Sequence, residues 1–212
     1  MTGRFITFEG GEGAGKSTQV RALVAHLRDL GLEVVQTREP GGSSGAEALR
    51  DLLVTGEAGR WSPMSETLMM YAARANHLEQ VIRPALERGA WIVCDRFSDS
   101  TRAYQGAGGG VTPELIETID TAVVGETQPD LVIVMDMPPQ AGLKRALERG
   151  DAENRFESKG LVFHERLREG FRRRAAAHPD RYCLIDADRS IEDIGADIWR
   201  VVSDRFPEVK GS

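Results

Sequence analysis

The chain has 212 residues, of which 41% are hydrophobic and 28% are charged. These proportions are typical of globular proteins and exclude a disordered, collagenous or coiled-coil chain. The formal net charge of −6 argues against a general surface for nucleic acid, but it is compatible with a local basic pocket for one small anion.

Cys94 and Cys183 are too few for a disulfide framework, and the apolar run at the N-terminus is too short for a signal peptide. No segment approaches the roughly 20 apolar residues of a membrane span. The four histidines lack the spacing of metal ligands. We therefore expect a cytoplasmic protein with neither a membrane nor a nucleic-acid partner.

Five short apolar or β-branched runs predict strands at residues 5–9, 33–38, 91–95, 131–136 and 182–186. Segments with helical spacing separate them, and the first of these helices ends at Gly31. Strands that alternate with helices pair in parallel through right-handed crossovers. We expect one α/β domain over residues 1–212, a doubly wound five-stranded parallel sheet with ligands at the carboxyl ends of its strands.

Three other segments bear on the shape of a site. A long helix is expected from 62 to 88, with Ser62 as its N-cap and a disturbance near Pro84, and it walls a cleft. The glycine cluster at 106–110 is expected to be a loop. The highly charged segment at about 142–160 is predicted to be a mobile helical lid.

A phosphate-binding motif follows the first strand directly. Residues 10–18 read GGEGAGKST and satisfy G-x-x-x-x-G-K-[ST] between a strand and an amphipathic helix. In such a loop backbone N–H groups surround phosphate oxygens, the lysine neutralises the β- and γ-phosphates, and the serine ligates Mg²⁺. We therefore expect ATP and Mg²⁺ to bind at Gly10, Gly11, Glu12, Gly13, Ala14, Gly15, Lys16, Ser17 and Thr18.

The motif alone does not choose among classes of nucleotide-binding protein. The Asn-Lys-x-Asp segment of GTP switches is absent from the sequence. A kinase needs a second anion site opposite the loop and a cover that excludes water. Arg38 and Arg96, at the ends of the second and third strands, are candidates for that second site, and Asp95 is a candidate to steer a Mg²⁺-bound water. In isolation, Arg38 fits a solvated side chain about as well as an anion site. Asp95 and Arg96 likewise fit a strand-end salt bridge about as well as these functional roles.

Together the motifs resemble the thymidylate kinase family of phosphate-loop enzymes, whose members transfer the γ-phosphoryl of ATP to dTMP. The resemblance spans nearly the whole chain. It rests on FEG at 8–10 leading into the loop, TREPGG at 37–42, YAAR at 71–74, DRF at 95–97, the run from Ser100 to the YQG at 104–106, and the arginines before FE at 156–157. It implies homodimers and a fold like that of nucleoside monophosphate kinases.

The resemblance also implies roles for individual residues. Arg38 and Arg96 hold the phosphate of dTMP, Glu12 contacts the 3′-hydroxyl, and Arg74 donates a hydrogen bond to thymine O4. Tyr104 crowds the 2′ position of the sugar and so disfavours ribonucleotides by steric exclusion.

Further implied contacts lie around the base. Ser100, Thr101 and Gln105 resemble the family's direct and water-mediated polar contacts. Met70 stands where many relatives have a phenylalanine that stacks on thymine, one helical turn before Arg74.

Some thymidylate kinases carry a catalytic arginine inside the phosphate loop, but this chain has Gly13 there. The resemblance to bacterial-type members then implies that an arginine of the lid, Arg149 or Arg155, supplies the positive charge that the loop lacks. The catalytic candidates are therefore Lys16, Arg96, Arg149 and Arg155.

We therefore expect in-line transfer from Mg-ATP to dTMP, giving dTDP. Two alternatives stay open: a kinase for another nucleotide or nucleoside, and an ATP-binding regulatory module without a monophosphate acceptor.

Overall fold

In the computed structural model, five parallel strands form one sheet in the order β2-β3-β1-β4-β5. The structure describes residues 3–57, 59–149 and 155–210. The strands are β1 Phe5–Gly10, β2 Val34–Arg38, β3 Trp91–Asp95, β4 Leu131–Asp136 and β5 Tyr182–Asp186. The predicted strands and the doubly wound architecture are confirmed, with shifts of one residue at the end of the first strand and the start of the second.

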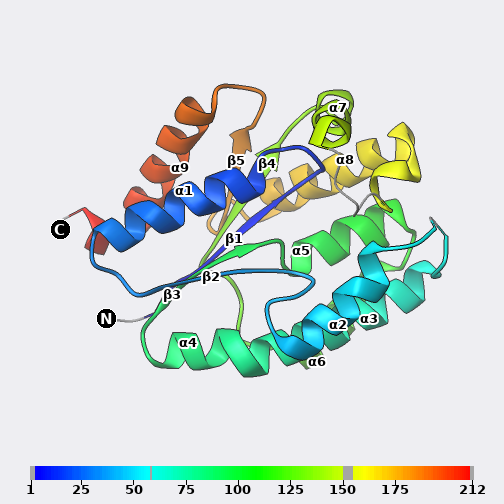
Figure 1. The fold of residues 1–212 in the computed structure, drawn as a ribbon, viewed down its shortest axis with the longest axis horizontal. Coiled ribbons are helices and arrows are strands. Elements are labelled where there is room, and N and C mark those ends of the chain that lie inside the picture. The colour runs from blue at the N-terminus through cyan, green and yellow to red at the C-terminus, as the bar shows by residue number, and fades with distance from the viewer. Residues whose placement is uncertain (1–2, 58, 150–154, 211–212) are drawn as a thin grey trace.

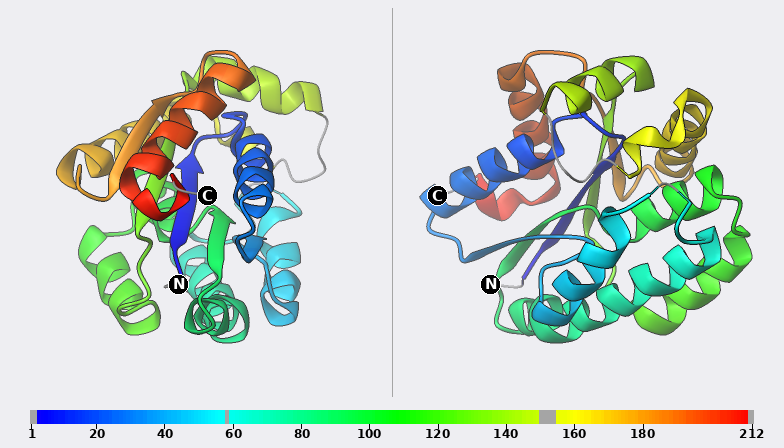
Figure 2. Two further views of the ribbon diagram at one scale, coloured as in Figure 1. Left: turned by 90° about the vertical axis from the view of Figure 1, so that its left-hand side faces the viewer. Right: turned by 45° about the vertical axis from the view of Figure 1, so that its right-hand side comes forward.

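Helices cover both faces of the sheet (Figures 1 and 2). Helices α1 (Lys16–Asp29) and α9 (Ile191–Arg205) pack on one face, against strand residues such as Phe8 and Ile133. The intervening residues point to the opposite face. There Ile92 packs under α3 (Pro63–His77) and α4 (Arg83–Glu87), and Val132 packs under α8 (Leu161–Ala177). Because both faces are covered, every residue of β1 is buried, which explains why the strands read as continuous apolar runs.

The predicted long helix is three consecutive helical segments. Helix α3 spans Pro63–His77, a π-helical turn η1 spans Leu78–Ile82, and α4 spans Arg83–Glu87. The hydroxyl oxygen of Ser62 accepts a hydrogen bond from the Ser65 N–H at 3.1 Å, as expected for an N-cap. Pro84 lies in the first turn of α4 and has no N–H to donate, so the regular α pattern is interrupted just before it.

The glycine cluster is only partly a loop. Helix α5 (Ser98–Thr101) continues into the π-helical segment η2 (Arg102–Gly108), so helix extends through the first three positions of the cluster. This segment packs against α8 (Leu161–Ala177), and the tertiary contact overrides the low helix propensity of glycine.

The remaining elements surround the sheet. They are α2 (Ser44–Val54), α6 (Pro113–Val123), α7 (Pro139–Arg149), η3 (Glu157–Lys159) and η4 (Pro207–Val209). Within the predicted lid, α7 and η3 flank residues 150–154, which lie outside the described residues.

Candidate active site

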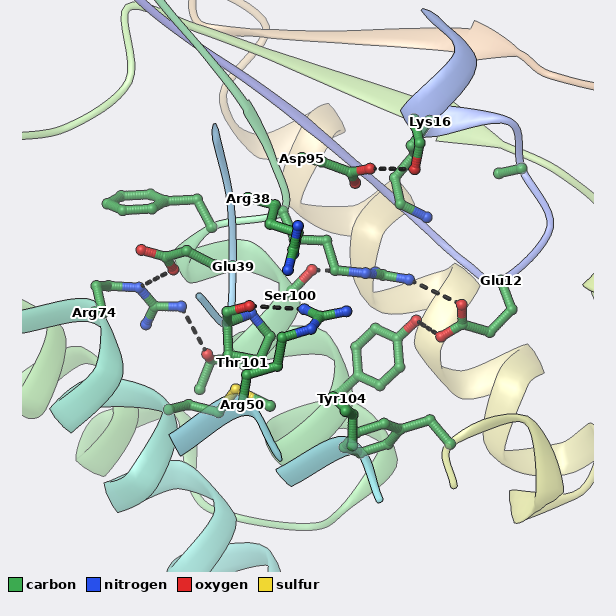
Figure 3. A pocket seen from close by; sticks show the side chains of 18 of the residues that line it. Glu12, Lys16, Arg38, Glu39, Arg50, Arg74, Asp95, Ser100, Thr101 and Tyr104 are labelled. Atoms are coloured by element: carbon green, nitrogen blue, oxygen red, sulfur yellow. Dashed lines mark hydrogen bonds and ion pairs between the residues drawn. The ribbon is translucent and has the colours of Figure 1, made fainter. Parts of the chain in front are cut away.

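A pocket of about 220 Å³ lies at the carboxyl ends of β1, β2 and β3. The phosphate-binding loop forms one wall, and α2, α3, α5 and η2 complete it (Figure 3). The pocket brings together most of the side chains that were predicted from the sequence. Those that line it are Glu12, Gly13, Ala14, Gly15, Lys16, Ser17, Arg38, Met70, Arg74, Asp95, Arg96, Ser100, Thr101, Tyr104 and Gln105.

Lys16 is the first residue of α1, and its ammonium group folds back across the loop. Its Nζ donates to the carbonyl oxygens of Gly11 at 2.7 Å and Gly10 at 3.2 Å. Burial and the nearby charge of Arg96 lower the pKa of Lys16 to about 8. The cation is therefore held at the N-terminus of α1, where backbone N–H groups favour an anion.

Gly13 approaches α7 too closely to carry a side chain. A Cβ at this position would lie 1.9 Å from the carbonyl oxygen of Gly142, and the φ angle of Gly13 is +66°. An arginine in the loop would thus require the start of α7 to move.

Ser17 and Asp95 meet at the floor of the pocket, where the serine hydroxyl donates to Asp95 Oδ2 at 2.6 Å. Both offer the oxygen ligands that Mg²⁺ prefers. Within the described ranges no three His, Cys, Asp or Glu side chains are grouped to hold a metal. The residues fit a Mg²⁺ ion that keeps waters and phosphate oxygens as most of its ligands.

Arg96 has an unusual backbone conformation, with φ of +69°, the only positive value at a non-glycine position among the described residues. Its Nη1 donates to the Gly10 carbonyl at 2.9 Å and its Nη2 to Glu12 Oε2 at 3.1 Å. The Tyr104 hydroxyl donates to Glu12 Oε1 at 2.6 Å. Burial raises the pKa of Glu12, but the charges of Arg96 and Lys16 outweigh it and hold the pKa at about 2.

Two further arginines reach the pocket from the β2 side (Figure 3). Arg38 is half-exposed and pairs with Glu47 at 3.0 Å. Arg50, on α2, donates from Nη1 to the Pro40 carbonyl at 2.7 Å. Sequence reasoning missed Arg50, because a charged residue in an amphipathic helix gives no signal of its own.

At the end of the pocket away from Glu12, Arg74 is buried with 2% of its surface exposed. Its Nε donates to Glu39 Oε2 at 2.7 Å and its Nη2 to Thr101 Oγ1 at 3.1 Å, whereas Nη1 has no partner among the described residues. The amide of Gln105 donates to Glu66 Oε2 at 3.0 Å and leaves its Oε1 without a partner there. One buried donor and one buried acceptor are thus unsatisfied beside the same pocket.

Glu9 belongs to the FEG motif at 8–10 but was not predicted as a site residue. Its carboxyl group accepts from the Phe97 N–H at 2.8 Å and lies 2.6 Å from the Ser100 hydroxyl. Burial and the neighbouring Asp99 raise the pKa of Glu9 to about 8.

Of the two lid arginines, Arg155 is the one whose side chain the structure describes, and it does not line the pocket. Arg155 is buried, and it donates to Glu66 Oε1 at 2.5 Å and to the Leu53 carbonyl at 2.8 Å. Arg149 ends α7, and its side chain lies outside the described part of the chain. Phe156, which was not predicted, does line the pocket and packs edge-on against Tyr104.

Three members of the predicted loop also lie outside the lining. Gly10 and Gly11 contribute carbonyl oxygens to Lys16, and Thr18 is in the first turn of α1, near Arg21.

The three consecutive arginines of α8 each pair with a carboxylate. Arg172 contacts Asp136, Arg173 contacts Glu169, and Arg174 contacts Asp99. They therefore do not form a run of free positive charge.

A parallel sheet whose first strand leads into a G-x-x-x-x-G-K-S loop, faced by arginines from two other strand ends, defines an α/β protein of the phosphate-loop kinase class. The family model for thymidylate kinase matches residues 8–198, and the chain belongs to this family.

Individual relatives agree with the family assignment. The thymidylate kinase of Caulobacter vibrioides is 57% identical over 204 residues, covering 96% of this chain and 98% of that protein. The thymidylate kinase of Nitrobacter winogradskyi is 46% identical, covering 96% and 89%. The crystal structure of thymidylate kinase from Ehrlichia chaffeensis superposes with a TM-score of 0.79 at 31% identity, covering 95% of this chain and all of that one. None of the described helices is both long and apolar enough to span a membrane.

Proposed function

We propose that this chain phosphorylates dTMP to dTDP, with ATP as the phosphoryl donor and Mg²⁺ as the metal. Family membership supports the reaction. The observation that carries it is a single pocket in which the loop lysine, Lys16, faces Arg38 and Arg96 from two separate strand ends. Two phosphorylated molecules therefore have cations on both sides of the point where they meet.

The acceptor phosphate binds Arg38 and Arg96, with Arg50 as a third cation on the same side. Arg96 is already oriented by Gly10 and Glu12, so little side-chain freedom is lost when the phosphate binds. Arg38 is more exposed and exchanges its contact with Glu47 for the phosphate.

The sugar lies next to Glu12 and Tyr104. The ionised Glu12 carboxylate accepts a hydrogen bond from the 3′-hydroxyl. The Tyr104 ring, fixed by its bond to Glu12, occupies the space that a 2′-hydroxyl needs.

The base lies at the other end, beside Arg74 and Gln105. Thymine presents an acceptor at O4 and a donor at N3, which complements the free Arg74 Nη1 and the free Gln105 Oε1. Ser100 and Thr101 are polar neighbours on the same wall, and the flexible thioether of Met70 packs on the ring.

The nucleophile is a phosphate oxygen of dTMP, which is already anionic because its second pKa is about 6. The chain's residues therefore supply position and charge rather than a strong general base. Lys16 neutralises the donor phosphates, and Ser17 and Asp95 hold the Mg²⁺ site. A Mg²⁺ ion held there would supply positive charge to neutralise the charge that develops on the phosphates.

The segment at 142–160 acts as the lid in this proposal and brings Arg149 or Arg155 to the transferred group. For Arg155 this requires exchange of its buried contact with Glu66. Closure then couples charge stabilisation to the exclusion of water.

A coupled assay of ADP release tests the function with dTMP, dUMP, dCMP, dGMP, AMP and thymidine as acceptors. We expect dTMP to give the highest kcat/KM. Preference for another acceptor supports the alternative kinase, and ADP release that no monophosphate changes supports the regulatory module. The proposal includes a homodimer in the cytoplasm, and sedimentation of the purified protein tests the dimer.

A further inference from the structure

His77 lies at the end of α3, three residues after Arg74, and none of its surface is exposed. Both ring nitrogens have partners. Nδ1 is 3.0 Å from Glu39 Oε1, and Nε2 is 2.7 Å from the hydroxyl oxygen of Thr37 on β2. The imidazole therefore links helix α3 to the end of β2 and to the residue that follows it.

The carboxylate of Glu39 contacts both Arg74 and His77, which lie on the same turn of α3. Arg74 Nε donates to Oε2 at 2.7 Å, and the His77 ring contacts Oε1. Residues three apart share a helix face, so one carboxylate bridges them. With Oε1 held by His77, the carboxylate cannot rotate freely, and the direction in which it accepts from Arg74 is set.

The orientation of Glu39 in turn decides where the guanidinium group of Arg74 points. Nε is used by Glu39 and Nη2 by Thr101, so the planar group has one pose, and in that pose Nη1 is the buried donor without a partner. The rings of Tyr71 and Phe97 lie 4.6 and 5.1 Å from the guanidinium carbon and restrict it further.

We infer that His77 is a positioning residue for nucleobase recognition: through Glu39 it fixes Arg74 with one donor aimed at the base of the acceptor nucleotide. This inference rests on the proposed function. The neutral tautomer with hydrogen on Nδ1 satisfies both contacts, because Nδ1–H donates to Glu39 and Nε2 accepts from the Thr37 hydroxyl. Because both nitrogens of His77 and both carboxylate oxygens of Glu39 are paired, this part of the network is rigid.

The turn after β2 packs directly against His77 and Thr37 at Gly42. A Cβ at Gly42 would lie 2.4 Å from His77 Nε2 and 2.5 Å from Thr37 Oγ1. The φ angle of Gly42, +87°, also favours glycine. The backbone therefore packs tightly against the network and closes it from the outside.

A double-mutant cycle separates positioning from a purely structural role. His77→Leu should lower kcat/KM for dTMP by about tenfold to a hundredfold, mainly through KM, as expected for a misplaced binding group. The KM for ATP should stay unchanged. In an Arg74→Ala background, the same His77→Leu change should have no further effect on kcat/KM.

Three further variants make the test specific. His77→Asn can present an amide N–H in place of Nδ1–H, so it should recover much of the lost kcat/KM. Thr37→Val removes only the contact to His77 Nε2 and should give a smaller loss of kcat/KM for dTMP. This variant also provides the test if His77→Leu does not fold. Leu78→Ala is the control, because Leu78 is the adjacent residue, is equally buried and packs with the core. It should lower the Tm and leave the KM for dTMP unchanged.

Two results overturn the inference: additive losses in the Arg74→Ala background, or equal losses toward dTMP and ATP that follow the Tm as in Leu78→Ala. If the wild type prefers another monophosphate, the proposed function is wrong, and the same cycle measured with that monophosphate decides the role of His77. If no monophosphate is phosphorylated, both proposals fail.

Discussion

The Ser17 hydroxyl at the start of α1 lies 2.6 Å from a carboxylate oxygen of Asp95 at the end of β3. The two residues are far apart in sequence and meet because β1 and β3 are neighbours in the sheet, with Phe8 paired to Asp95. Parallel neighbours bring their carboxyl ends to one edge, so the loop after β1 lies against the end of β3.

Asp95→Asn should raise the concentration of Mg²⁺ needed for half-maximal rate and lower kcat by about tenfold to a hundredfold, the range typical of groups that orient metal ligands. The amide keeps the size of the side chain but removes its charge. Ser17→Ala should act in the same direction, and the double variant should lose less than the two single losses combined, because both serve one ion. ADP release against Mg²⁺ concentration measures this, and EDTA should abolish the wild-type rate. Unchanged Mg²⁺ dependence in both variants would place the metal elsewhere.

Lys16→Ala should lower kcat by about a hundredfold to a thousandfold, the range seen when one stabiliser of transition-state charge is removed. Because the pKa of Lys16 is lowered to about 8, the free protein loses this positive charge as the pH rises through that value. The kcat/KM for ATP should therefore fall between pH 7 and pH 9. In Lys16→Arg, whose guanidinium stays charged, any residual activity should lack this fall. Wild-type rates of Lys16→Ala would refute the role.

Tyr104→Ala should reduce the preference for dTMP over the corresponding ribonucleotide by roughly tenfold to a hundredfold, since the ring excludes the 2′-hydroxyl by its bulk. Tyr104→Phe is the matched control. It keeps the ring but loses the bond to Glu12, so it should lower kcat/KM for both nucleotides and retain the preference. Ratios of kcat/KM for the two acceptors measure this. A lost preference in Tyr104→Phe would mean that the hydroxyl, not the ring, discriminates.

Arg155→Ala should lower the free energy of unfolding by about 3–5 kcal/mol, because it leaves the buried carboxylate of Glu66 without its guanidinium partner. Adding Glu66→Gln should restore part of the loss, since a neutral amide costs less to bury. Under native conditions kcat should also fall with little change in KM for dTMP. Denaturant unfolding and steady-state kinetics separate the two effects. Collapse of dTMP binding would contradict the lid assignment.

The parts of the site that residue patterns alone predict are those tied to strand ends. The predicted pocket residues on helical segments come only from the family resemblance, and they are Met70, Arg74, Ser100, Thr101, Tyr104 and Gln105. The loop at 10–18, Arg38 and Asp95 each lie at or directly after the end of an apolar run, so the rule for parallel sheets is enough to place them at one edge of the sheet. The close approach of Gly13 to Gly142 could not be predicted in this way, because the motif fixes Gly10 and Gly15 and leaves position 13 open.

Residues on helices were harder to predict. Arg50 and Phe156 reach the pocket through the packing of α2 and of the segment before α8, and neither has a motif of its own. The burial of Arg155 depends on Glu66, a residue of α3 far away in sequence. Such pairings depend on tertiary packing, which local patterns do not encode.

Glu9 should make the stability of the protein fall as the pH rises. Its pKa is raised from 4.5 to about 8, so between these values the folded state holds a proton that the unfolded state has released. The stabilisation is complete below about pH 4.5 and is lost as the pH rises toward 8. Glu9→Gln retains an acceptor for the Phe97 N–H but cannot ionise, so it should be more stable than the wild type at pH 8. Chemical denaturation at pH 5, 6.5 and 8 measures the difference between the two proteins. Equal slopes for wild type and variant would show that Glu9 titrates at its ordinary pKa.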